Sequence, residues 1–306
     1  MTASVDLGTG EIGLPGTISP VPGPTARSGR AGGVAMMVAS ALSNQVGAAV
    51  GALGFPAIGA VGVVAIRQWI AAAVLVTVGR PRWRTFTRRE WLPVLALAAV
   101  YATMNVSLYT SIDRIGLGLA VTLEFLGPLA VALASTRRWL DLGCAAAVGG
   151  AVVVLIDPRP STDYVGIGLG LLAAACWAGY ILLNRVVGRL LPGVQGSGAA
   201  AGCSALIYVP IGIALFVHHA PDLAAVGCAA AAGIGSSAIP FLVDLLVLRR
   251  VPARFYGIFM SINPMLAALI GWAILDQTLH GPQWAAMGVI VAANAISVAT
   301  VRAGTG

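Results

Sequence analysis

Residues 115–135 read IGLGLAVTLEFLGPLAVALAS, an apolar stretch with one charged side chain, Glu124, and one proline, Pro128. About 20 consecutive apolar residues form a helix long enough to cross the ~30 Å hydrocarbon core of a bilayer. Arginines bound the stretch on both sides, at Arg114 and Arg137. The stretch therefore predicts a transmembrane helix that carries a carboxylate close to the middle of the membrane.

The rest of the 306-residue chain has the same character, with 58% hydrophobic and only 9% charged residues and a mean hydropathy of +0.90. Soluble domains carry about a quarter charged residues, so the composition excludes an ordinary cytosolic globule. Nine further stretches are long enough to span a bilayer: 33–53, 58–79, 91–110, 140–156, 165–185, 197–217, 223–248, 255–275 and 282–301. We predict an all-α polytopic membrane protein with ten transmembrane helices.

Residues 1–32 differ from the rest because they are rich in proline, glycine, serine and threonine and have no apolar periodicity. Such a segment buries too little surface to offset its ordering entropy, so we predict a disordered cytoplasmic tail. The apolar run that follows contains Ala39-Ser40-Ala41, which is similar to a signal-peptide cleavage site. The run continues to Leu53, and we interpret it as the first transmembrane helix.

The arginines predict the orientation of the chain, because cytoplasmic loops of membrane proteins carry an excess of positive charge. All 18 cations are arginine, which excludes a P-loop lysine and a lysine Schiff base. With both termini in the cytoplasm, fifteen arginines face inside, Arg114 and Arg159 face outside and Arg67 lies within a span. The clusters lie between apolar runs, so we expect a multi-pass inner (plasma) membrane protein with no nucleic-acid partner, despite a pI of about 9.8.

An internal repeat is also visible. Arg114 is followed 14 residues later by Pro128, and 136 residues further on Arg250 is followed by Pro264 in the same way. Five spans in each half is an odd number, so the halves have opposite orientations, as in the inverted repeats of secondary transporters. The expected five-helix repeats are residues 33–156 and 165–302.

The stretch 118–133 (GLAVTLEFLGPLAVAL), with the arginine pair after it, closely resembles the fourth span of the threonine/homoserine exporters, in the EamA-type branch of the drug/metabolite transporter superfamily. Supporting similarities lie at 62–67, 175–182, 237–244 and 260–268, and the resemblance covers 33–302. It implies two EamA-type domains that export small neutral amino acids, with proton antiport as the expected coupling. Two departures leave substrate and coupling open: Asp276-Gln277-Thr278 replaces the family's Gly-Glu-Thr, and Asn263-Pro264 replaces Glu-Pro.

Ionisable side chains inside a membrane cost about 2.5–3.5 kcal/mol each on insertion scales, so they tend to face a bundle interior. Glu124 and Arg67 lie at similar depths of about 13–15 Å, at 1.5 Å per residue. We predict that Glu124 exchanges a proton or binds the substrate amine, while Arg67 tunes it or receives a carboxylate; a structural ion pair is the alternative. Asp244 either lies on the same pathway or pairs with Arg249 at the membrane surface. The outer aspartates are expected to be solvated loop charges: Asp113, Asp157, Asp163, Asp222 and Asp276.

Other polar and aromatic groups at membrane depth complete the predicted pathway. The amides could bind a zwitterion or hold helices together: Asn44, Gln45, Asn105 and Asn263. Trp177 and Tyr180 lie inside the sixth predicted span, where they line a pocket or pack in the core. Three prolines are candidate hinges, because each frees a carbonyl that lipid does not satisfy: Pro128, Pro240 and Pro264.

The sequence therefore predicts a secondary transporter whose partners are a small-molecule substrate, protons and the lipid bilayer, with a homodimer left open. A carrier of another metabolite or drug is the alternative within transport. A membrane enzyme or a non-transporting partner subunit is the alternative of another class. It is disfavoured because the chain has no catalytic constellation, and its four cysteines fall singly in apolar spans. We expect no cofactor and no metal.

Overall fold

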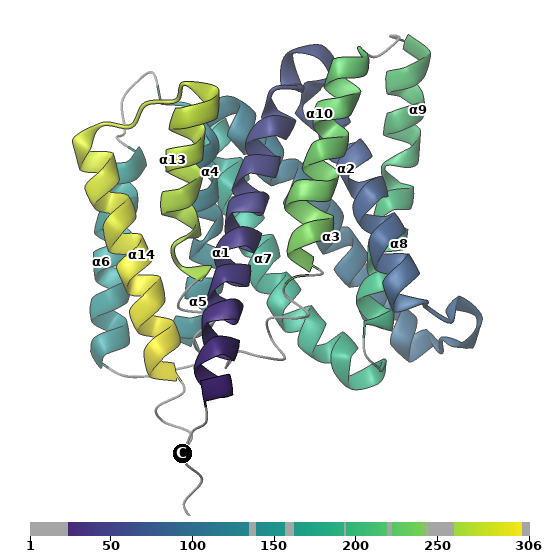
Figure 1. Ribbon diagram of the computed structural model, residues 1–306, viewed down its shortest axis with the longest axis horizontal. Coiled ribbons are helices and arrows are strands. Elements are labelled where there is room, and N and C mark those ends of the chain that lie inside the picture. The colour runs from purple at the N-terminus through teal and green to yellow at the C-terminus, as the bar shows by residue number, and fades with distance from the viewer. Residues whose placement is uncertain are drawn as a thin grey trace, which may run out of the picture.

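The computed structural model describes residues 24–134, 139–156, 162–192, 194–218, 222–241, 243 and 260–301. Within these ranges every regular element is a helix (Figure 1). Six segments are long and apolar enough to cross a membrane, by length and composition: Ala35–Ala52, Phe55–Gly79, Arg88–Ile115, Tyr164–Leu190, Gln195–Ala214 and Leu223–Phe241. The all-helical, multi-pass character predicted from the sequence is thus confirmed.

The first half of the chain contains seven helical elements in the described residues. They are α1 (Pro24–Ala52), α2 (Phe55–Gly79), the short η1 (Trp83–Thr85), α3 (Arg88–Ile115), α4 (Leu117–Glu124), α5 (Leu126–Ala134) and α6 (Trp139–Ile156). The start of α1 differs from the prediction, because the helix begins at Pro24 and not at residue 33. Once a helix is nucleated, each added residue gains one hydrogen bond; residues 1–23 of the predicted tail lie outside the described ranges.

The second half contains α7 (Tyr164–Leu190), α8 (Gln195–Ile207), α9 (Val209–His218), α10 (Leu223–Gly233), the π-helix η2 (Ile234–Ala238), α13 (Asn263–Leu275) and α14 (Gly281–Val301). Two of the predicted spans are broken helices. The span at 115–135 divides into α4 and α5 at Phe125, and the span at 197–217 divides into α8 and α9 at Tyr208.

Helices that are far apart in the sequence lie side by side in an upright bundle (Figure 1). The packed pairs include α3 with α7, α2 with α8, α6 with α14, and α1 with α10. Small residues allow the backbones to approach. A Cβ added to Gly127 would lie 2.2 Å from the carbonyl oxygen of Ala174, and one added to Gly47 would lie 2.6 Å from the amide nitrogen of Ser236. Close packing of this kind drives helix association in lipid, where apolar burial between helices gains little.

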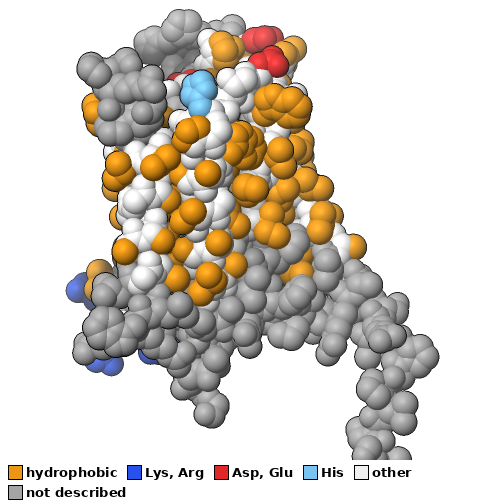
Figure 2. Space-filling view, turned by 90° about the vertical axis from the view of Figure 1, so that its left-hand side faces the viewer, with side chains coloured by type: hydrophobic (Ala, Val, Ile, Leu, Met, Phe, Trp, Pro, Cys, Tyr) orange, Lys and Arg blue, Asp and Glu red, His pale blue; other side chains and the backbone are white. Residues whose placement is uncertain are grey.

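The outer surface of the bundle fits a lipid environment. Figure 2 shows hydrophobic side chains over the middle of one face, with acidic side chains at one end and arginines toward the other. Large apolar side chains are exposed on several helices, such as Leu92 at 74%, Val153 at 60% and Trp272 at 60%. Monomeric soluble proteins rarely expose such extended apolar surface, so these faces are ones that the bilayer covers.

Candidate functional site

A cavity of about 630 Å³ lies in the middle of the bundle, between α1, α2, α3, the α4–α5 break, α7, η2, α13 and α14. Most of the residues singled out from the sequence line it: Asn44, Gln45, Arg67, Glu124, Pro128, Trp177, Tyr180, Pro240 and Asn263. Asn105 does not line the cavity but hydrogen-bonds Arg67, and Pro264 is buried in α13. Asp244 lies outside the described residues.

Glu124 is the last residue of α4, directly before the break at Phe125. Its side chain is 7% exposed and lines the cavity. In the described part of the chain no hydrogen bond or ion pair engages its carboxylate. A buried carboxylate without a partner is costly, and it is therefore suited to bind a cation or a proton that enters the cavity.

Arg67, by contrast, is held by neighbours on two elements, α3 and η2. Its Nε donates to the Ser236 hydroxyl at 3.0 Å, one terminal nitrogen donates to the Ser236 carbonyl at 3.3 Å, and the other donates to the Asn105 side-chain oxygen. Its guanidinium carbon lies 4.8 Å from the centre of the Tyr109 ring, a cation–π contact. The guanidinium is therefore a fixed positive charge in the cavity wall.

The direct Arg67–Glu124 ion pair that their similar depths allow is not formed. Among the described residues, the one ion pair within 4 Å joins Arg114 and Asp163, at 2.9 Å. Depth along a helix says nothing about which neighbour a side chain faces, and Arg67 faces α3 and η2. The two cavity charges are thus left separate, one fixed and one without a partner.

Pro240 explains why Arg67 has this environment. Proline lacks the N–H that would bond a carbonyl four or five residues earlier, at Ser236 or Gly235. Both carbonyls find side-chain donors: Arg67 bonds the carbonyl of Ser236, and the Ser43 hydroxyl bonds that of Gly235 at 2.7 Å. The proline and the π-helix before it therefore expose backbone acceptors that tie α1 and α2 to η2.

Pro128 and Pro264 do not interrupt regular helices. Pro128 is the third residue of α5, and Pro264 is the second residue of α13. Proline is well suited to the first turn of a helix because its missing N–H has no intrahelical partner there. Each proline therefore begins the helix that follows a break.

Two of the predicted amides bond each other. The Gln45 side-chain nitrogen donates to the Asn263 side-chain oxygen at 3.1 Å, and the Asn263 nitrogen donates to the Met260 carbonyl at 2.9 Å. Gln45 and Asn263 are 2% and 3% exposed. They connect α1 to the start of α13, so their geometry favours the helix-packing role over ligand binding.

Aromatic rings form the apolar part of the wall. The Phe125 and Trp177 rings meet edge to face at 4.7 Å, and the Tyr180 ring lies 5.4 Å from that of Tyr101. Edge-to-face pairs fix ring orientation. The cavity therefore combines a rigid aromatic surface with one cation and one carboxylate.

Sequence reasoning missed five lining residues that matter for the geometry: Ser40, Tyr109, Phe125, Ser236 and Asn294. Asn294 carried a usable signal, because it is an amide at membrane depth like the four that were chosen. Ser236 had no comparable signal, since a serine in a glycine- and alanine-rich span is common in membrane helices.

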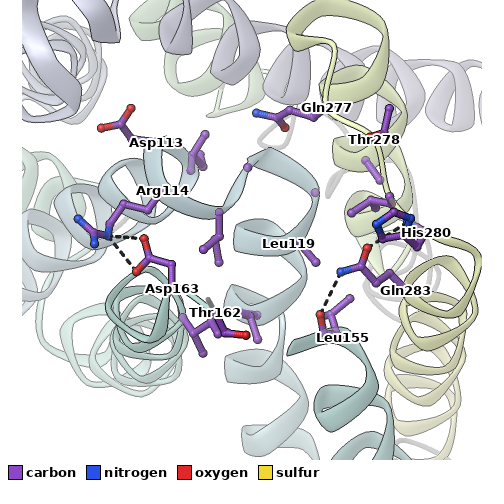
Figure 3. A pocket seen from close by; sticks show the side chains of 18 residues that line it. Asp113, Arg114, Leu119, Leu155, Thr162, Asp163, Gln277, Thr278, His280 and Gln283 are labelled. Carbon is purple, nitrogen blue, oxygen red and sulfur yellow. Dashed lines mark hydrogen bonds and ion pairs between the residues drawn. The ribbon is translucent and has the colours of Figure 1, made fainter. Parts of the chain in front are cut away.

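A second cavity, of about 620 Å³, lies at the ends of α3 and α13 (Figure 3). Its polar wall includes Gln277, whose side-chain oxygen accepts a 2.8 Å hydrogen bond from the Leu117 amide. Asp163 is not simply a solvated loop charge: it pairs with Arg114 and caps α7 through the Gly166 amide, 2.8 Å away. These hydrogen bonds hold the pKa of Asp163 below its ordinary value.

The fixed position of Arg67 leads to a prediction for Arg67→Lys. An ammonium is a point charge that cannot reproduce the planar fork of a guanidinium, so at least one bond to Asn105 or Ser236 is lost. Losing a hydrogen bond to a charged group costs about 1.5–3 kcal/mol. We expect a lower melting temperature of the purified protein and a large loss of transport. Arg185→Lys, at an exposed position on α7, is the control and should change neither; an Arg67→Lys protein as stable as wild type would contradict the network.

In the described residues no three His, Cys, Asp or Glu side chains gather closely enough to hold a metal ion. The cavity wall offers one negative group, Glu124, and one positive group, Arg67, which together match the two charges of a zwitterion.

Comparison with known proteins identifies the family of the chain. Residues 164–299 match the EamA-like transporter family. The threonine/homoserine exporter RhtA of Escherichia coli K12 is 38% identical over 274 residues, covering 88% of this chain and 92% of the relative. RhtA of Salmonella typhimurium LT2 is 36% identical over 264 residues, covering 85% and 89%. One solved crystal structure, described only as that of a protein, shares the fold with a TM-score of 0.58 at 19% identity, covering 88% of this chain and 96% of its own. The chain therefore belongs to the EamA-like transporter family, among the relatives of the exporter RhtA.

Proposed function

We propose that this protein is an inner-membrane secondary transporter that exports small neutral amino acids of the threonine and homoserine kind in exchange for protons. The observation that carries the proposal is the Glu124 carboxylate, which bonds none of the described residues, in a central cavity that also contains the fixed charge of Arg67. The names of the relatives at 36–38% identity supply the substrate class.

The proposed transport cycle assigns a role to each charge. Glu124 binds either the substrate ammonium or a proton, so that the two occupy it in turn and move in opposite directions. Arg67 has five N–H donors, of which the protein uses three, and the remainder serve the substrate carboxylate. Because Arg67 does not bond Glu124, neither group has to release the other before the substrate binds.

The proposed architecture is ten spans in two inverted repeats, with both termini in the cytoplasm. The packing supports it, because helices at equivalent places in the two halves make equivalent contacts. The third span of the first half, α3, packs on the first two helices of the second half, α7 and α8, while its counterpart α10 packs on α1 and α2. Gln68 donates to Ser204 at 2.8 Å and Trp69 donates to the Ala205 carbonyl at 3.1 Å, and each pair is 136 residues apart. This is the offset of the repeat read from the sequence, as expected for helices that meet on the axis between the halves.

Export of another small metabolite or a drug is the second candidate. A specific observation favours it: the aromatic pair Phe125–Trp177 gives the cavity an apolar surface, and the cavity volume of about 630 Å³ exceeds what a small amino acid needs. Drug-sized ligands occupy pockets of about 300–1,000 Å³. The two candidates predict different exported compounds.

The test is export by cells that express the protein and are fed threonine- or homoserine-containing dipeptides, with extracellular compounds profiled by mass spectrometry. We expect faster efflux of threonine or homoserine than in empty-vector cells, and we expect a protonophore to abolish the difference. No difference, with the protein confirmed in the membrane, would reject amino-acid export and favour the second candidate.

A further inference from the structure

Asn294 is a buried amide that the protein leaves unsatisfied. It lies on α14, is 3% exposed, and lines the central cavity. In the described residues its side-chain nitrogen is fully covered and has no hydrogen-bond partner. Buried polar groups in native proteins are nearly always paired, so an amide in a cavity wall that is not fully paired points to a ligand that bonds it.

The other buried amides around the cavity already have hydrogen-bond partners in the protein. Gln45 and Asn263 bond each other, and Asn105 bonds Arg67 and the Tyr101 carbonyl. Their hydrogen-bonding capacity is directed at the protein. In the described part of the chain, neither the Glu124 carboxylate nor the Asn294 side-chain nitrogen has a hydrogen-bond partner.

The positions of Arg67, Glu124 and Asn294 indicate which part of a substrate each residue binds. Arg67 lies on α2, which packs on α8 and α10, whereas Asn294 lies on α14, which packs on α5, α6 and α13. Figure 1 shows α2 and α14 on opposite sides of the bundle. When the substrate carboxylate binds Arg67 and its ammonium binds Glu124, the side chain of the substrate faces the rest of the cavity wall. That part of the wall includes Asn294.

The hydrogen-bonding groups of the Asn294 amide match those of a hydroxyl. An amide donates through nitrogen and accepts through oxygen, and a hydroxyl also both donates and accepts. An ionised carboxylate only accepts hydrogen bonds, so it needs donors alone from the protein. The Asn294 nitrogen is covered in the empty cavity, and a half-turn about the last side-chain torsion, which is soft in asparagine, exchanges its nitrogen with its oxygen.

We propose that Asn294 hydrogen-bonds the side-chain hydroxyl of the exported amino acid and makes the site prefer hydroxylated substrates. This inference rests on the proposed function and goes beyond it by naming the group that reads the side chain. After the half-turn, the nitrogen donates to a substrate hydroxyl at the cavity surface, whereas the side chain of an analogue without a hydroxyl offers Asn294 no partner there.

The experiment measures transport into proteoliposomes for threonine, homoserine and 2-aminobutyrate, which lacks the hydroxyl of both. A net hydrogen bond corresponds to about a three- to tenfold difference in affinity. We expect wild-type KM values about three- to tenfold lower for the hydroxylated substrates. In Asn294→Leu, which keeps the volume and removes the amide, we expect the three KM values to converge while that for 2-aminobutyrate stays unchanged.

Two further variants separate ligand recognition from a structural role. Asn294→Leu removes an unsatisfied buried donor, so its melting temperature without substrate should equal or exceed that of wild type. Asn184→Ala removes an amide that bonds Ser197 away from the cavity, and the hydroxyl preference should persist in it. Asn44→Leu changes a cavity amide that hydrogen-bonds none of the described residues, and it should also keep the preference.

The outcomes distinguish this inference from the proposed function. A wild-type protein that transports threonine and 2-aminobutyrate equally well would overturn the role of Asn294 and leave amino-acid export standing. So would an Asn294→Leu protein that keeps the preference, or an Asn44→Leu protein that loses it. A wild-type protein that transports none of the three would overturn the proposed function, and this inference with it.

Discussion

Glu124→Gln is expected to abolish export driven by a pH gradient while leaving the amount of folded protein in the membrane unchanged. The amide has almost the same shape as the carboxylate, so the α4–α5 break and the cavity keep their packing. It binds neither a proton nor an ammonium ion with charge assistance. Losing a charge-assisted hydrogen bond costs about 1.5–3 kcal/mol, which corresponds to about 10- to 150-fold in affinity.

The measurement for Glu124→Gln is made in proteoliposomes with and without an imposed pH gradient. We expect the variant to show neither gradient-driven transport nor exchange of labelled for unlabelled substrate, because one carboxylate serves both cations. Glu90→Gln is the matched control, because Glu90 bonds Thr87 at the beginning of α3 and does not line the cavity. Wild-type gradient-driven export by Glu124→Gln would remove Glu124 from the mechanism.

Gly127→Ala is expected to cause the largest loss of stability of any single methyl addition to the bundle. The new Cβ would lie 2.2 Å from the Ala174 carbonyl oxygen and 3.0 Å from its carbon. These are backbone atoms of α7, which cannot rotate away as a side-chain tip can. Overpacking typically costs about 1–3 kcal/mol and occasionally more, so α5 and α7 must separate or the protein must fail to accumulate.

The test is the melting temperature and the monodispersity of the detergent-solubilised protein. Gly149→Ala on α6 is the matched control, because a Cβ there meets nothing within 4 Å. Alanine is the better helix former by about 1 kcal/mol, so the control should be as stable as wild type or more so. Equal melting temperatures for the two variants would show that α5 and α7 are not in contact at Gly127.

The sequence indicated which charged residues face the interior of the bundle, but not which residues they bond. Hydropathy and arginine positions predict that Glu124 and Arg67 lie deep within spans, and both line the central cavity. Which neighbour each one faces depends on how each helix is rotated and tilted, and a hydropathy pattern carries no such information. The direct Arg67–Glu124 ion pair, which the sequence left as an alternative, is not formed, because Ser236 and Asn105 engage Arg67 instead.

The prolines illustrate a similar limit. Their residue type indicates a missing N–H, but its consequence depends on where the helix begins. Pro128 and Pro264 lie in first turns, where nothing is lost, whereas the carbonyls before Pro240 are bonded by Ser43 and Arg67. No composition signal marks the π-helix η2, because its pattern of bonds between residues five apart depends on those tertiary contacts.

The π-helix at Ile234–Ala238 limits how the sequence of this protein can change in length. A π turn has the geometry of an α turn into which one residue has been inserted. Deleting one residue there would restore a regular helix, yet would rotate every later side chain by about 100°. Pro240 and Phe241 would then leave the cavity wall that they now line. Insertions and deletions that loops accept freely are therefore excluded from this short segment, whose length is as constrained as its composition.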